Sequence, residues 1–157
     1  MLTVGTDAYS SLVDVDAYHA ARGNAEWAAV VDATREVYIR KGTDWVDRTF
    51  TFIGDMATGT QRLKWPRKYA EIEGNVLSDL TIPWQVAEAT AIIADLFRLG
   101  TYDMEGIVTT EAAITSQKVD VIEVHYDTAA RIKGPAVPSH VYALLQPLTN
   151  QNKLLRA

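Results

Sequence analysis

The feature that most constrains the fold is the apolar segment TIPWQVAEATAIIADLFRLG, residues 81–100. Pro83 suits the first turn of a helix and Gly100 suits the position after the last turn, so both ends are marked. Apolar side chains recur between them at the three- and four-residue steps of a buried helical face. That face comprises Val86, Ala89, Ile93, Leu96 and Phe97, and Ile92 widens it. We therefore expect a central helix around which the rest of the chain packs.

Two helices are expected before this one. Ser11 is a candidate N-cap for a helix over residues 11–22. Asn24 is the next candidate cap, for a helix over residues 25–48, and the pattern leaves a break near residue 31 open. The apolar stripe of this second helix consists of Trp27, Val31, Thr34, Tyr38 and Trp45. The charged residues that fall off the stripe and are expected in solvent are Arg35, Glu36, Arg40 and Lys41.

A short apolar helix is expected near the end of the chain, with Ser139 as its cap and Pro147 near its end. Its face consists of Val141, Leu144, Leu145 and Leu148. The expected fold is therefore mainly α. It is a small bundle of about four helices with one long Trp-Pro-Arg loop and one β-hairpin, forming a single domain over residues 1–149 with a tail at 150–157.

The long loop covers residues 50–81, where no helical or strand period is sustained. Trp65 is expected to enter a gap between the helices and to anchor the loop, although exposure until a partner covers it stays an alternative. Pro66 is expected to fix an extended path, because the residue before a proline is pushed out of the α region. Arg67 would then reach an interface or a nearby carboxylate. Residues 73–75 predict a turn.

The β-hairpin is predicted from a period of two over Ile122, Val124 and Tyr126. A preceding strand at about 114–119 and a turn near Asp120 would complete it. A lone hairpin is marginal in water, so it must pack on the helices or pair with another copy of the chain. The residues expected at that contact between copies are Lys118, Glu123 and His125.

The charge is unevenly distributed along the chain. The net charge is −5, but no acidic residue follows Asp127. Residues 128–157 carry +4, which leaves −9 for the first 127 residues. The C-terminal segment is either a frayed end or a partner-binding tail that docks on an acidic surface. In the second case the anchors and steering charges are Lys153, Leu154, Leu155 and Arg156.

No motif in the sequence indicates catalysis. The chain has no cysteine, and His19, His125 and His140 lie in separate predicted elements without metal-ligand spacing. We expect no enzyme activity, no cofactor and no metal. No apolar run approaches the ~18 residues of a membrane span, and the N-terminus lacks signal-peptide features, which fits synthesis in the cytoplasm.

One cluster has the composition of a single-strand binding site. It consists of Arg62, Lys64, Trp65, Arg67, Lys68 and Tyr69. Aromatic and basic side chains together can stack on bases and neutralise phosphates. The cluster is local and the domain is acidic, however, whereas phosphate binding depends on a basic footprint. We therefore do not expect specific DNA binding.

The order of these motifs resembles the head–tail connector (adaptor) proteins of tailed phages, some of which are described as DnaT-like single-stranded-DNA-binding proteins. The similar segments are LTVGTDAYSSLVDVDAYHAARG, NAEW, Gly54, Gln61, Trp65-Pro66-Arg67, Gly74, Ile82-Pro83, SQKVDVIEVHY and LLQPL. They cover almost the whole chain. Asp120 stands where a glycine is usual, and YIRKGTDWVD is more charged than the corresponding helix of the family.

The resemblance implies a ring, usually of twelve copies, beneath the portal at the neck of the virion. Such a ring extends the DNA channel without gripping the DNA, and it offers a platform to the tail or to a stopper protein. The tail at Lys153–Arg156 would insert into the portal, while the hairpin and loops would contact other copies. A single-stranded-DNA-binding accessory protein and another tail-completion component stay open as alternatives.

Overall fold

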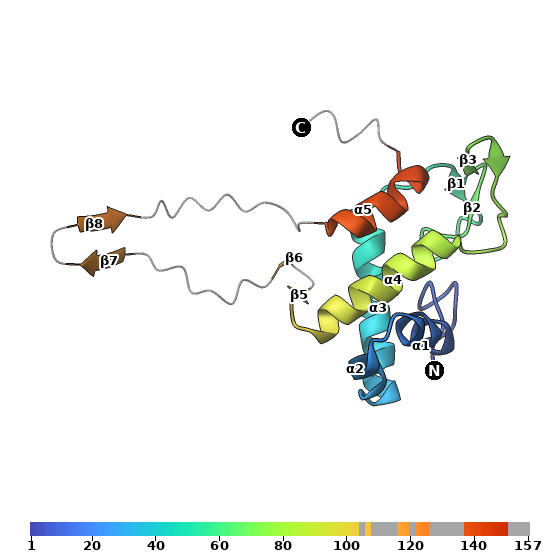
Figure 1. Ribbon diagram of the computed structural model, residues 1–157. Helices are drawn as coiled ribbons and strands as arrows, with labels where there is room; N and C mark the ends of the chain where they lie inside the picture. Colours follow the sequence, from blue (N-terminus) through green and yellow to red (C-terminus); the bar gives the residue numbers. More distant parts are fainter. Residues whose placement is uncertain (104–105, 108–115, 120–121, 126–136, 151–157) are drawn as a thin grey trace.

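A computed structural model of the chain describes residues 1–103, 106–107, 116–119, 122–125 and 137–150 (Figure 1). The helices are α1 (Leu12–Ala21), α2 (Ala25–Ala28), α3 (Asp32–Thr49), α4 (Trp84–Arg98) and α5 (Ser139–Leu145), followed by a 3₁₀ turn at Gln146–Leu148. The strands are β1 (Asp55–Met56), β2 (Arg67–Lys68), β3 (Glu71–Ile72), β4 (Asn75–Val76), β5 (Tyr102–Asp103), β6 (Gly106–Ile107), β7 (Ser116–Val119) and β8 (Ile122–His125). The fold is mainly α, as the sequence predicts.

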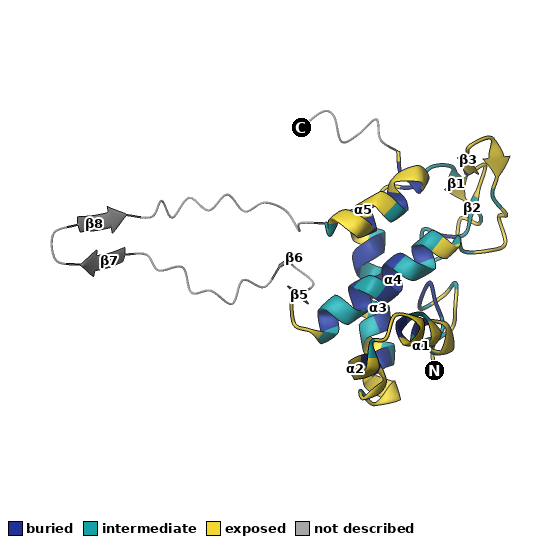
Figure 2. Cartoon of the chain, viewed as in Figure 1, coloured by how far each residue is buried: buried dark blue, intermediate teal, exposed yellow. Residues whose placement is uncertain are grey.

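Helix α4 is the centre of the fold. It contacts α1, α3 and α5, and Figure 1 shows α5 on one side of it and α1 on the other. Figure 2 shows buried residues concentrated in α3 and α4 and exposed residues along α1 and α2. The predicted buried face is confirmed at Val86, Ala89, Ile93 and Phe97, while Leu96 is half-buried. None of the helices in the part of the chain that the structure describes is long and apolar enough to cross a bilayer.

The predicted caps agree with the structure at the first two helices. The Ser11 side chain accepts a hydrogen bond from the Asp14 amide at 3.1 Å, and Asn24 accepts one from the Trp27 amide at 3.3 Å. The second helix is broken after Ala28, at the place that the pattern left open. The prediction for Ser139 is wrong, because Pro138 is the N-cap of α5 and Ser139 is already helical.

The apolar stripe predicted across the second helix is confirmed at Trp27 and Trp45, and Tyr38 is partly buried, but the prediction is wrong at Val31 and Thr34. Val31 is 71% exposed and Thr34 is also exposed. The break between α2 and α3 shifts the helical phase, so the buried face of α3 no longer continues from Trp27. The residues that α3 buries are Arg35, Ile39, Gly42, Thr43, Trp45 and Val46.

Arg35 was expected in solvent, but its side chain is buried. It forms ion pairs at 2.6 Å with Asp16 of α1 and at 2.6 Å with Asp32 in the first turn of α3. The Trp27 indole donates a hydrogen bond to Asp16 at 2.7 Å. The guanidinium can therefore lie between α1 and α3 because a carboxylate on each helix compensates its charge.

Helices α3 and α4 approach each other most closely at Gly42. A Cβ atom added at Gly42 would lie 2.7 Å from the Thr90 carbonyl oxygen and 3.2 Å from the Ala94 amide nitrogen. Both atoms belong to the backbone of α4 and cannot move aside alone. Glycine at this position therefore allows the two helices to pack together.

We expect Gly42→Ala to lower the free energy of unfolding by about 1–3 kcal/mol. The overpacking penalty exceeds the gain of up to about 1 kcal/mol that alanine brings to a helix. Urea denaturation of the variant and the wild-type chain would measure the difference. A variant as stable as the wild type would show that the two helices can separate at little cost.

The loop over residues 50–81 contains short antiparallel pairs that the sequence analysis missed. β1 pairs with β2, and β3 pairs with β4 through a turn at Glu73 and Gly74, where both φ angles are positive. That turn confirms the prediction for residues 73–75. The Trp65–Pro66 peptide bond is cis. The predicted extended path is found in β2, whereas the chain bends at residues 62–64 and at Pro66.

Residues 148–150, at the end of the described chain, pair with residues 51–53 at the start of the long loop. The Ile53 amide donates to the Leu148 carbonyl at 3.0 Å, and the Asn150 amide donates to the Thr51 carbonyl at 3.1 Å. Phe52 and Thr149 form the bridge between these two bonds. Residues 51–53 thus begin the loop as an extended segment held by the residues that follow α5.

The predicted β-hairpin is present as β7 and β8. Ser116 lies opposite His125, and Lys118 lies opposite Glu123. The pairing of the two strands is therefore confirmed, and packing of the hairpin on the helices or against another copy of the chain stays a prediction.

Candidate functional site

Trp65 lies at the centre of the larger apolar cluster and is 0% exposed. Its ring meets that of Phe52 edge to face, with centroids 5.6 Å apart. The same cluster contains Val86 and Ile93 of α4 and Leu145 of α5. The loop is therefore attached to the helices by its largest side chain, as the anchor interpretation expects.

A polar contact beside Trp65 fastens the loop to α3. The Tyr9 hydroxyl donates to the Asp47 carboxylate and accepts from the Trp65 amide at 3.3 Å. The Lys64 amide donates to the other Asp47 oxygen at 3.2 Å, and its ammonium donates to the carbonyls of Asp47 and Phe50. Burial and the neighbouring carboxylate raise the pKa of Tyr9, which therefore stays a hydrogen-bond donor at any ordinary pH.

Arg67 closes the loop on itself. Its guanidinium donates to the Ile53 carbonyl at 2.6 Å, to the Lys64 carbonyl at 3.1 Å and to the Gly54 carbonyl. The expectation that Arg67 reaches an interface or a nearby carboxylate stays a prediction beside these contacts. The loop backbone makes few regular hydrogen bonds of its own, so these three carbonyl groups need other donors. The N–H groups of the Arg67 guanidinium supply them.

These contacts leave little of the predicted aromatic and basic cluster at the surface. Trp65 is in the core, and the charged ends of Lys64 and Arg67 are bound to backbone carbonyls. The members that remain exposed are Arg62, Lys68 and Tyr69. Two cations and one aromatic ring make a much smaller surface for stacking and phosphate contact than the six residues suggested.

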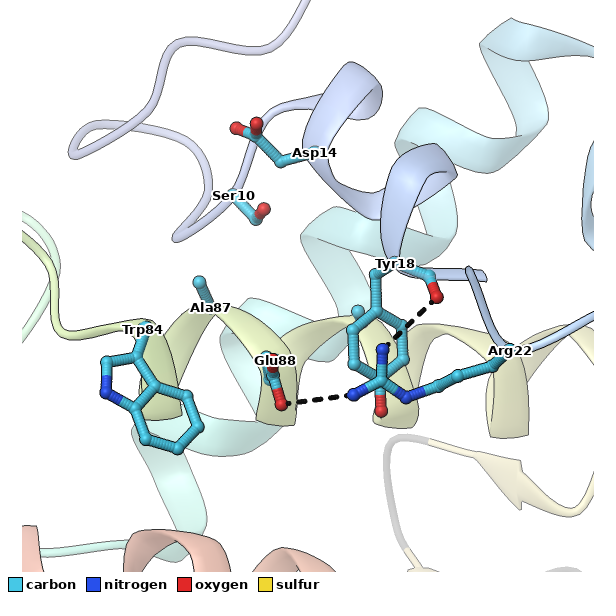
Figure 3. A pocket seen from close by; sticks show the side chains of 8 residues that line it. Ser10, Asp14, Tyr18, Arg22, Trp84, Ala87 and Glu88 are labelled. Carbon is cyan, nitrogen blue, oxygen red and sulfur yellow. Dashed lines mark hydrogen bonds and ion pairs between the residues drawn. The ribbon is translucent and has the colours of Figure 1, made fainter. Parts of the chain in front are cut away.

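A surface groove between α1 and α4 was missed by the sequence analysis (Figure 3). One compartment has a volume of about 250 Å³ and is bounded by Tyr18 of α1, by Arg22 at the C-cap of α1 and by two residues of α4, Trp84 and Glu88. A second compartment of about 400 Å³ shares Ser10, Asp14 and Ala87 with the first. Its further lining residues are Val4, Gly5, Tyr9, Pro66, Leu80, Thr81 and Ile82. The two compartments adjoin each other at the three shared residues, and together we call them the α1–α4 groove.

The α1–α4 groove combines exposed apolar side chains with a small set of charges. Trp84 is 61% exposed and Leu80 is 84% exposed. Arg22 lies 3.5 Å from the centre of the Tyr18 ring and 3.5 Å from the Glu88 carboxylate. A sequence signal existed for this surface, because Trp84 is apolar yet falls off the predicted buried face of its helix.

The described residues offer no other obvious chemical centre. They contain no group of three histidine, cysteine, aspartate or glutamate side chains placed to hold a metal ion. His19 is buried, whereas His140 is exposed at the start of α5. Within this part of the chain, the loop anchor and the groove are thus the features that require a functional explanation.

A family model described as "Putative DnaT-like ssDNA binding protein" matches residues 2–157 of the chain. The chain belongs to this DnaT-like family. No curated protein and no solved structure matches it significantly. The match includes the N-terminal segment, the Trp-Pro-Arg loop, the hairpin and the tail in one continuous unit.

Of the remaining predicted contact residues of this DnaT-like protein, the structure describes those of the hairpin but not those of the tail. Lys118 and Glu123 face each other across the β7–β8 pair, and His125 lies at its end opposite Ser116. Their contact with another copy stays a prediction. The tail residues Lys153, Leu154, Leu155 and Arg156 lie outside the described residues.

His19 joins α1 of the DnaT-like protein to α4. Its Nε2 lies 3.2 Å from the Ala91 carbonyl oxygen, and its Nδ1 lies 3.3 Å from Nδ2, the side-chain nitrogen of Asn24. A neutral ring with Nε2 donating and Nδ1 accepting satisfies both contacts. Burial lowers the pKa of His19 in the folded protein, although the Asp95 and Asp16 carboxylates act in the opposite direction.

We expect the wild-type protein to be less stable at pH 5 than at pH 7.5, partly because of His19. The unfolded chain takes up a proton near the ordinary pKa of about 6.5, whereas the folded chain takes it up only at lower pH. The stability that neutral His19 contributes is therefore lost as the pH falls below about 6.5. Urea denaturation at both pH values should show a smaller difference in His19→Gln and an unchanged one in His140→Gln.

Proposed function

We propose that the chain is a head–tail adaptor of a tailed phage, which assembles into a ring beneath the portal. The ring, of about twelve copies, would extend the DNA channel and carry the tail or a stopper protein. The observation that carries this proposal is the β7–β8 hairpin, whose two strands pair with each other. A hairpin of four-residue strands gains stability when its open edges are covered.

Neighbouring copies of the chain would cover the open edges of this hairpin. Closed rings of identical subunits bury such edges because every subunit offers the same surface to the next. Lys118 and Glu123, which lie opposite each other in the hairpin, would be among the residues at that contact. An acidic body with −9 charges over the first 127 residues also suits a channel wall that repels the DNA backbone.

The second candidate is a single-stranded-DNA-binding accessory protein, which the description of the family favours. The loop argues against it for this chain. Lys64 and Arg67 donate to backbone carbonyls, and Trp65 is buried, so these residues are not free to hold a strand. Binding would rest on Arg62, Lys68 and Tyr69 at the surface of an acidic protein.

Two measurements test the proposal. Negative-stain microscopy and light scattering of the purified protein, alone and mixed with portal, should show a ring that attaches to the portal. A ring that does not bind the portal but binds tail proteins would instead indicate another tail-completion component. A protein that stays monomeric under every condition would refute the adaptor assignment.

Titration with a labelled oligonucleotide at low salt tests the second candidate. We expect weak binding or none, and no change in the variant with Arg62, Lys68 and Tyr69 all replaced by alanine. Strong binding that falls steeply with salt, and that the triple substitution abolishes, would establish the DNA-binding function in place of the adaptor role.

A further inference from the structure

The α1–α4 groove is an apolar surface that no described element covers. Its floor and rim expose Leu80 and Trp84, and Val4 is also about half exposed. Ala87 and Ala91 on the neighbouring turns of α4 are small, so the groove lies open beside the indole. Grouped apolar side chains of this kind at the surface of a protein indicate a binding site for another polypeptide.

The charges around the groove are mainly negative. Asp14 borders both compartments, and Glu88 borders the first. The cation, Arg22, already lies over the Tyr18 ring and beside Glu88, as Figure 3 shows. A phosphate chain would meet two carboxylates here, whereas an apolar segment flanked by lysine or arginine would match both the surface and its charge.

The chain itself contains such a segment. Residues 150–157 read NQNKLLRA, in which Lys153 and Arg156 flank Leu154 and Leu155. The whole chain has the same asymmetry, because residues 128–157 carry +4 and the first 127 carry −9. Two leucines between two cations complement an apolar groove bordered by two carboxylates.

We propose that the α1–α4 groove binds the tail, residues 150–157, of a neighbouring copy of the chain. The proposal rests on the proposed ring and names one contact that would build it. Asn150 is paired with Thr51 next to α5, which lies on the side of α4 opposite α1 in Figure 1. The described chain therefore ends beside α5, on the side of α4 opposite α1, and this favours binding to the groove of the next copy.

A contact between tail and groove would be of the head-to-tail kind. Each copy gives one tail and receives one, so the interface uses two different surfaces of the same protein. Contacts of this type form closed rings when the rotation between copies is correct. The groove would then determine the direction in which the copies follow one another around the ring.

Tryptophan fluorescence provides a direct test, because Trp84 is exposed while Trp27, Trp45 and Trp65 are buried. The receptor is the full chain with Leu154→Asp and Leu155→Asp, which keeps the groove and disables its own tail. The probe is a synthetic peptide NQNKLLRA, which contains no tryptophan. We expect a saturable blue shift of the emission as the peptide covers the indole.

Matched variants locate the binding site. Glu88→Lys in the receptor should weaken binding of the peptide by about tenfold or more, because attraction becomes repulsion. Trp84→Ala should remove the fluorescence change, and the anisotropy of a labelled peptide should show weaker binding. Val13→Ser, at an exposed position of α1 outside the groove, should leave both signals unchanged. The proposal would be overturned if the receptor did not bind the peptide, or if the Glu88→Lys receptor bound it as tightly as the receptor with Glu88.

The assembly state separates this proposal from the adaptor function. If the tail substitutions Leu154→Asp and Leu155→Asp leave ring formation unchanged and only block attachment to portal, the tail binds the portal and the groove proposal fails while the adaptor function stands. If the peptide binds the groove but the protein forms no ring with or without portal, the adaptor function fails. Tail binding within one chain, seen as a signal independent of protein concentration, would also overturn the proposal.

Discussion

Replacing Trp65 with alanine is expected to lower the free energy of unfolding by about 3–5 kcal/mol, as for other fully buried aromatic side chains. The indole is 0% exposed and packs against Phe52 among residues of α4 and α5. Its loss leaves a cavity between the loop and the helices, and the neighbouring contacts of Tyr9 and Lys64 would lose their support. Denaturation in urea, followed by circular dichroism, measures the effect.

Trp84→Ala is the matched control for this experiment. Its side chain is 61% exposed, so the stability should change by no more than about 0.5 kcal/mol. A Trp65→Ala protein with unchanged stability but lost assembly would contradict the anchor role. In that case Trp65 would belong to an interface between copies.

The second large effect is expected for Gly54→Ala. Gly54 has φ +72°, and an added Cβ would lie 2.3 Å from the Lys68 carbonyl oxygen and 2.8 Å from the Ala70 amide nitrogen. The left-handed backbone costs an alanine about 1–2 kcal/mol, and overpacking against backbone adds about 1–3 kcal/mol. We therefore expect the unfolding free energy to fall by about 2–5 kcal/mol in urea denaturation.

Gly59→Ala is the control for Gly54, since Gly59 lies in the same loop with no atom within 4 Å of an added Cβ. This control should be neutral or slightly stabilising. The Gly54 carbonyl also accepts from Arg67, so a shifted Gly54 should weaken that contact as well. Equal stability of the two variants would mean that the loop tolerates a different path over β2.

The sequence predicted the helices better than it predicted the loop. The signals at Pro83 and Gly100, at Ser11 and at Asn24 are local, and the structure uses each of them close to the expected place. Local signals suffice for these elements because caps and periodicity act within a few residues. The β7–β8 hairpin was found for the same reason.

Arg35 and Gly42 show what the sequence could not provide. Arg35 was judged by its position relative to one helical stripe, and the break after Ala28 moved that stripe. The burial of Arg35 depends on Asp16, and the role of Gly42 depends on Thr90. Such partners come from distant segments, so neither could be inferred from the period of α3 alone.

The loop illustrates the same limit for function. Its composition suggested a surface for single strands, since aromatic and basic residues alternate there. Only the contacts of Lys64 and Arg67 with backbone carbonyls indicate that these cations serve the fold. The α1–α4 groove was missed because it joins Tyr18 and Arg22 to Trp84, which are separated by about sixty residues of sequence.

Residues 51–53 pair with residues 148–150, which lie 95 to 99 positions later in the chain (148 − 53 and 150 − 51). Closing so long a segment is slow, because the entropy of bringing its ends together must be overcome before any contact forms. During synthesis the backbone of residues 51–53 lacks these partners until residue 150 has left the ribosome. The nascent chain can therefore complete this part of its core only after that point, and a copy that has not reached it cannot join an assembly that needs the finished loop.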